Sequence, residues 1–200
     1  MNAELFKSIL VCGNTTADIV MLTNEPYNLS QKRRIHSLAI SAGGQAANAA
    51  VALADLGNNV SFVGMFGNDN YAELTQRDFD THGIDISSSY FFDAPHHLGF
   101  VNVDQSNGDR KIDMYKSPVM NAKGLDISSL NLNTISCMYF DGHEPELSLE
   151  LCATNIHHGF DIPVVLDIEA INEYTPSLMA AASHIVAPIE ILCEFFGVND

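Results

Sequence analysis

The stretch SAGGQAANAAVALADLG, residues 41–57, decides the fold of this chain. A glycine pair is followed by an alanine-rich run of strong helix formers, and the run stops at Gly57, as helices commonly do. We expect a helix over residues 45–56 whose small side chains allow close packing on a sheet. Its first backbone N–H groups are expected to face a polar or anionic ligand, because a helix N-terminus carries unpaired donors and a positive dipole end.

Strands and helices alternate on both sides of this helix. The run ILVCG, residues 9–13, is apolar and closed by glycine, which is typical of a strand buried on both faces of a parallel sheet. The order predicts an α/β fold with a doubly wound, mostly parallel sheet. Later strands are expected at 60–66, 135–140, 164–167 and 185–186, and helices at 70–82, 145–158, 177–182 and 190–196.

Short runs of mixed polarity interrupt the alternation twice, and they predict a small β-strand lid rather than core. We place the lid strands within about residues 18–40 and 89–116, with Asn107-Gly108 as a hairpin signal. The whole chain, residues 1–200, is interpreted as a single, incomplete domain.

Composition excludes several partners. The chain has 25 Asp and Glu against 9 Lys and Arg, a formal charge of -16. Such a charge repels nucleic acid and anionic membranes, so neither is expected as a partner. No signal peptide and no run long enough to span a bilayer is recognised, and a cytoplasmic location is expected. The four cysteines lack metal-ligand spacing and are predicted to be buried, free thiols.

The segment GNTTAD, residues 13–18, lies just past the first strand, where open α/β sheets bind ligands. The Asp18 carboxylate there can accept hydrogen bonds from two adjacent hydroxyls, which suits a sugar diol. Taken alone, this segment favours the simpler explanation that Asp18 caps a turn or faces water.

The second polar cluster is the start of the 45–56 helix, where Asn48 offers both a donor and an acceptor. Its spacing matches neither the dinucleotide-binding glycine pattern nor the P-loop, which argues against both of those classes.

The order and spacing of several motifs together resemble the ribokinase-like, phosphofructokinase B family of carbohydrate kinases. The motifs are Gly13-Asn14-x-x-x-Asp18, then Gly43-Gly44-Gln45-Ala46-Ala47-Asn48-x-Ala50, Leu53-x-x-Leu56-Gly57, Val63-Gly64-x-x-Gly67-x-Asp69, Gly83-Ile84-Asp85 and residues 106–110.

The resemblance implies roles for residues of the first two motifs. Asp18 and Asn48 would hold sugar hydroxyls, the Gly43-Gly44 backbone would approach the substrate, and Thr16 and Gln45 would contact it. It also implies ATP and Mg²⁺ as cofactors, a small-molecule sugar as substrate, and a lid that can join two copies as a homodimer.

Two elements of the family pattern are missing or altered. The family's Gly-Ala-Gly-Asp signature, which supplies an anion hole and the general base, does not occur in these residues, so no catalytic base is assigned and it is expected in a later segment. The family's Asn-x-x-Glu element falls on residues 187–191 with Pro188 and Ile191 at its key positions, which leaves Glu190 as the metal candidate.

Other polar residues have weaker claims. His143 follows a predicted strand in Asp141-Gly142-His143-Glu144 and is a second-tier substrate contact, although turn chemistry explains Asp-Gly there. Asp167 is similarly placed. The pairs His96-His97 and His157-His158 have poor geometry for one metal and are predicted to lie on the lid or surface.

The leading hypothesis is an ATP-dependent sugar kinase of which this chain carries the sugar-binding part. A catalytically dead truncated remnant or a sugar-binding pseudokinase is the alternative from another class, and a nucleoside kinase of the same family is a further one. The sugar, the phosphorylated hydroxyl and the phosphate donor stay open.

Overall fold

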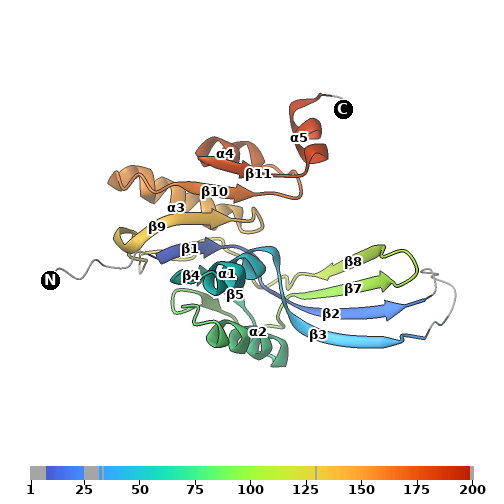
Figure 1. Ribbon diagram of the computed structural model, residues 1–200. Coiled ribbons are helices and arrows are strands. Elements are labelled where there is room, and N and C mark those ends of the chain that lie inside the picture. Colours follow the sequence, from blue (N-terminus) through green and yellow to red (C-terminus); the bar gives the residue numbers. More distant parts are fainter. Residues whose placement is uncertain (1–7, 25–31, 33, 129, 199–200) are drawn as a thin grey trace.

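The computed structural model describes residues 8–24, 32, 34–128 and 130–198. Its main sheet has the strand order β11-β10-β9-β1-β4, and every neighbouring pair in it is parallel. The predicted α/β fold with a doubly wound parallel sheet is therefore confirmed (Figure 1). The strands are β1 (Ser8–Cys12), β4 (Val60–Val63), β9 (Ile135–Phe140), β10 (Val164–Asp167) and β11 (His184–Val186).

Helices cover both faces of the main sheet. On β1, Leu10 and Cys12 join one core cluster while Val11 joins the other, as expected when successive side chains point to opposite faces. The cluster of Val11 is formed with α1 (Gln45–Asp55) and α2 (Asn70–Thr81), and that of Leu10 with α3 (Pro145–His158) and α4 (Thr175–Ala181). The helix α5 (Ile189–Phe196) follows β11 near the C-terminus (Figure 1).

A second sheet forms the lid, in the order β3-β2-β7-β8. The pairs β2–β3 and β7–β8 are antiparallel, whereas β2 and β7 run parallel. Figure 1 shows this sheet projecting beyond the ends of the main-sheet strands. Its strands are β2 (Thr16–Thr23), β3 (Ser37–Gly43), β7 (Leu98–Asp104) and β8 (Arg110–Tyr115).

The strand expected over residues 60–66 is divided at Gly64. The chain there lies against the segment after β1, and a Cβ on Gly64 would come 2.7 Å from the carbonyl oxygen of Gly13. Beyond this point β5 (Met65–Phe66) leaves the main sheet and pairs with β6 (Tyr90–Phe91). A 3-10 turn, η1 (Leu132–Thr134), precedes β9.

In the described ranges, none of the helices has the length and apolar character needed to span a membrane. All four cysteines are free thiols, and Cys12 and Cys152 are buried. Burial raises the pKa of Cys152 to about 11 and also raises the pKa of Cys12. These thiols stay protonated and pack as small apolar groups.

Candidate functional site

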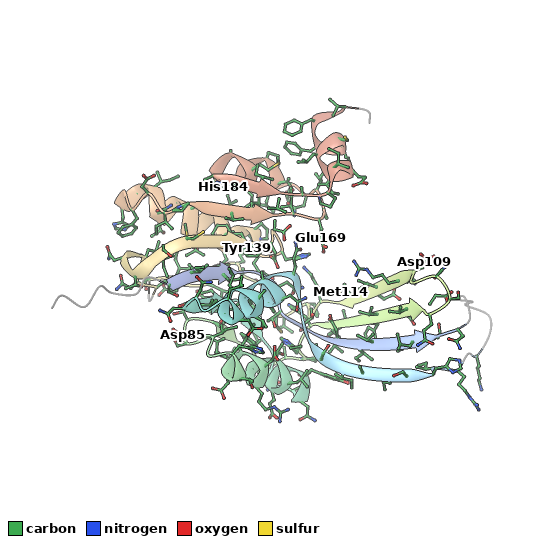
Figure 2. The ribbon with its side chains drawn as sticks, viewed as in Figure 1. Asp85, Asp109, Met114, Tyr139, Glu169 and His184 are labelled. Carbon is green, nitrogen blue, oxygen red and sulfur yellow. The ribbon has the colours of Figure 1, made fainter. Side chains whose placement is uncertain are left out.

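A cavity of about 500 Å³ lies between the lid and the carboxyl ends of the main-sheet strands. Figure 2 shows Met114 on the lid side of this junction, and Tyr139 and Glu169 on the main-sheet side. The lid strands contribute Thr16, Asp18, Val101, Ile112 and Met114, and the remaining lining residues are Asn14, Gly44, Gln45, Asn48, Lys116, His143 and Glu169.

The lid register places Asp18 on the face that looks into the cavity. Asp18 pairs with Gly99, and Gly99 pairs with Met114, so Asp18 and Met114 lie on the same face of the lid. A Cβ on Gly43 would come 2.2 Å from Oδ2 of Asp18, and one on Gly99 would come 2.5 Å from Oδ1. The two glycines therefore leave the space that the carboxylate occupies.

Thr16 fixes the orientation of that carboxylate. Its hydroxyl donates to Oδ1 of Asp18 at 2.8 Å, and Thr16 itself is buried. Asp18 lines the cavity, and its carboxylate has further lone pairs that can accept hydrogen bonds.

The start of α1 is used differently from our expectation. Gly44 has φ 103°, a conformation that favours glycine. A Cβ at this position would come 2.6 Å from the carbonyl oxygen of Asn14, so there is no room for a side chain. The N–H of Ala46 donates to Oδ2 of Asp141 at 3.1 Å, and that of Ala47 donates to the carbonyl oxygen of Asn14 at 3.3 Å. These two first-turn donors are thus paired inside the protein and are not offered to a ligand.

Asp141 is more than the turn residue that its Asp-Gly context suggested. Its Oδ1 does accept from the N–H of His143 at 2.9 Å, but Oδ2 also accepts from Asn14 at 2.8 Å and from Ala46. The side chain is buried, and burial raises the pKa of its carboxyl although the three N–H bonds oppose that rise. Asp141 therefore joins β9, the segment after β1 and α1, behind the cavity.

Lys116, His143 and Glu169 form a polar bridge from the end of β8 to the main sheet. Lys116 Nζ lies 3.5 Å from Nδ1 of His143, and Nε2 of His143 lies 3.3 Å from Oε1 of Glu169. Lysine only donates and carboxylate only accepts, so Nδ1 of His143 faces a donor and Nε2 faces an acceptor. The bridge lies at the rim of the cavity and links the lid to the main sheet.

Asp167 supports the floor instead of lining the cavity. Its Oδ2 accepts from the hydroxyl of Tyr139 at 2.8 Å, and its carbonyl oxygen accepts from Nε2 of Gln45 at 3.2 Å. Burial, and then the contact with Asp167, raises the pKa of Tyr139, so its hydroxyl stays protonated and donates.

The residues singled out in the sequence are largely brought together, although their roles as ligand contacts stay predictions. Asp18, Thr16, Gly44, Gln45, Asn48 and His143 line the cavity, whereas Gly43 lies behind the carboxylate of Asp18.

Glu190 is exposed in the first turn of α5 and does not line the cavity. Within the ranges that the structure describes, no three His, Cys, Asp or Glu side chains come together as a metal site.

Three polar lining residues were missed by sequence reasoning, together with the apolar Val101, Ile112 and Met114. Asn14 stood inside the first motif and was passed over because Asp18 carried the chemistry. Lys116 and Glu169 follow β8 and β10, and only the docking of the lid onto the main sheet brings them to one rim.

His96 and His97, which were predicted to lie on the lid or surface, are buried next to the start of β7, whereas His157 and His158 are exposed as expected. Nδ1 of His96 accepts from the N–H of Gly67, and Nδ1 of His97 accepts from Ser117 at 2.9 Å. Burial lowers the pKa of both rings to about 4, so they are neutral at neutral pH.

We expect His97→Asn to reduce the loss of stability in acid. The folded pKa of His97 is about 4 against 6.5 for the free side chain, so between these values only the unfolded chain binds the proton, and stability falls as pH falls through this window. From pH 7 to pH 5 the free energy of unfolding should fall by about 2 kcal/mol more in the wild type than in the variant. The amide oxygen of the variant can still accept from the N–H of Ser117. Urea unfolding measures this. His157→Asn is the surface control, and equal pH dependence of His97→Asn and wild type would contradict the assignment.

The comparisons with known proteins agree with this geometry. The family model for pfkB family carbohydrate kinases matches residues 7–197. Mouse ketohexokinase is 24% identical over 197 residues, which are 97% of this chain and 62% of that protein.

Solved structures show the same fold. The ribokinase of Arabidopsis thaliana, complexed with ribose and ATP, superposes with a TM-score of 0.78 at 20% identity over 96% of this chain and 63% of its own. The ribokinase of Thermotoga maritima gives a TM-score of 0.78 at 22% identity, over 96% of this chain and 64% of its own. The chain thus spans less than two thirds of these proteins. The match of the family model over residues 7–197 shows that it belongs to the pfkB family of carbohydrate kinases.

Proposed function

We infer that this chain holds the sugar substrate of an ATP-dependent sugar kinase, with Asp18 as the main contact. The observation that carries this is the placement of the Asp18 carboxylate inside a cavity of about 500 Å³ beneath the lid. A volume of this size accommodates a small ligand, and a carboxylate with free lone pairs suits two neighbouring hydroxyls.

The lining supports a polyhydroxy ligand with one apolar face. Val101, Ile112 and Met114 give the lid side an apolar surface, while Asp18 and Asn48 supply hydrogen-bonding groups. In this proposal Asp18 and Asn48 hold hydroxyls, Thr16 orients Asp18, and Gly44 lets the backbone approach the ligand. Gln45 and His143 contact its far side.

ATP and Mg²⁺ belong to the proposed reaction but are not assigned to residues here. Glu190 lies away from the cavity, and the described ranges hold no cluster of three acidic, histidine or cysteine ligands. When bound, the nucleotide supplies the transferred phosphoryl group. The residues of this chain would position the sugar hydroxyl, which is a large part of catalysis in such transfers.

Calorimetric titration of the purified 200-residue protein with D-ribose, D-fructose and uridine tests the proposal. We expect saturable binding of a monosaccharide with a Kd below about 10 mM, and weaker or no binding of the nucleoside. A coupled assay of sugar-dependent ADP release then separates a kinase from a sugar-binding protein without transfer. Failure of every monosaccharide to bind would overturn the proposal, and a preference for uridine would favour a nucleoside kinase.

The lid is also proposed to join two copies of the chain as a homodimer. Leu38 and Ile40 expose 59% and 46% of their surface on β3, at the open edge of the lid sheet. Exposed apolar side chains beside an unpaired strand favour association. Light scattering on the eluted protein should give twice the chain mass, with Leu38→Lys restoring the monomer. A monomeric wild type would reject this arrangement.

A further inference from the structure

The inner wall of the cavity carries two buried acceptor atoms without a partner. Asn14 is 4% exposed, and its Oδ1 has no hydrogen-bond partner in the part of the chain that the structure describes. The same holds for Oε1 of Gln45. Both residues line the cavity that contains Asp18.

Local bonds hold the backbone of Asn14 and the side-chain amide of Gln45. The N–H of Asn14 donates to Asp141 at 2.8 Å, and its carbonyl oxygen accepts from Ala47, so its backbone is fixed on both sides. The amide nitrogen of Gln45 faces the carbonyl oxygen of Asp167, an acceptor, which directs Oε1 away from it.

A buried acceptor without a donor carries an uncompensated desolvation cost, and such groups in native proteins call for an explanation. Thr15 and Ser117 provide a comparison inside the same molecule. Their hydroxyl oxygens are also buried without partners, but neither residue lines the cavity. The amide pair differs because a ligand in the cavity can reach it.

We propose that Asn14, assisted by Gln45, is a specificity-determining residue that accepts a hydrogen bond from a ligand hydroxyl distinct from the diol on Asp18. This rests on the proposed function, because it assumes that a sugar fills the cavity. At this point the wall presents two unpaired acceptor oxygens, and the N–H of Asn14 is held by the buried carboxylate of Asp141. A free hydroxyl can donate a hydrogen bond to these oxygens, whereas a deoxy or O-alkyl group at the same point cannot.

The test combines a substitution in the protein with the removal of one hydroxyl from the ligand, as in a double-mutant cycle. The probes are D-ribose and its single-deoxy analogues. Calorimetry gives the affinity of each for wild type, Asn14→Leu and Thr15→Val. Asn14→Leu should weaken D-ribose about 10- to 100-fold, because a donor hydroxyl is then left unpaired. For one deoxy analogue, the one lacking the hydroxyl at this subsite, wild type and Asn14→Leu should bind equally. Thr15→Val should leave all affinities within about twofold.

Each outcome has a distinct meaning. Absence of D-ribose and D-fructose binding by wild type would sink the proposed function itself. Normal D-ribose binding by Asn14→Leu, or an equal loss for every analogue, would overturn only the role of Asn14. Urea unfolding should show that Asn14→Leu is as stable as wild type, since it removes an unpaired buried group. If Asn14→Leu does not fold, Asn14→Ala and the deoxy series on wild type give the same decision.

Discussion

Replacing Asp141 by alanine should destabilise the chain by about 2 to 4 kcal/mol, the largest stability effect that we expect. The change leaves the buried N–H groups of Asn14 and Ala46 without an acceptor, and it also releases the N–H of His143. The cost is reduced because the variant no longer buries a carboxylate, whose pKa is already raised by burial. Urea unfolding at constant pH measures the loss.

Asp85→Ala is the matched control for this variant. Oδ1 of Asp85 accepts from the N–H two residues later, as Oδ1 of Asp141 does. Asp85 is exposed, however, and among the described residues its side chain bonds to no other segment. We expect Asp85→Ala to change the free energy of unfolding by less than about 0.5 kcal/mol. A loss for Asp141→Ala no greater than for the control would show that Asp141 does not join the three segments.

Asp18→Asn should weaken sugar binding by about 100-fold or more, the largest effect that we expect on binding. Two charge-assisted hydrogen bonds to a diol become neutral ones, and one of the two oxygens is replaced by a donor that cannot accept from a hydroxyl. The space left by Gly43 and Gly99 is filled equally by the amide, so the fold should be preserved. Calorimetry with the monosaccharide that binds the wild type most tightly measures the change.

Asp113→Asn makes the same change of charge elsewhere on the lid. Asp113 is exposed on β8, lies 3.0 Å from Lys111 and does not line the cavity. The affinity of the Asp113→Asn variant for the sugar should stay within about twofold of wild type, because an exposed charge outside the cavity is screened by solvent and salt. Equal affinity of Asp18→Asn and wild type would reject the diol assignment.

The fold was predictable because its signals are local. Alternating apolar runs and glycine stops placed β1, α1, α2, β9 and α3 close to their observed bounds. The lid strands were expected because their polarity did not suit a core. The division of the chain at Gly64 was not foreseen, since it depends on contact with Gly13, which no local pattern reports.

Part of the cavity lining was predictable, because it belongs to motifs that are contiguous in the sequence. Asp18 and Asn48 were found from their motifs, and both line the cavity. Lys116 and Glu169 meet only after the lid docks on the main sheet. The burial of His96 and His97 was not predicted, because adjacent histidines in a sequence suggest a polar, exposed segment. In the structure, a ring nitrogen of each accepts a backbone N–H group in the interior.

The lid is not a separate flap, because its strands run directly into the segments that line the cavity. β1 passes into β2 through residues 13–15, and β3 passes into α1 at Gly44. A tilt of the lid would rotate backbone angles at these joints as well as at the connections before β7 and after β8. The first two joints carry Asn14 and adjoin Asp18 and Gln45. In the proposed function these joints carry or adjoin the ligand contacts, so we expect ligand binding and the orientation of the lid to be coupled.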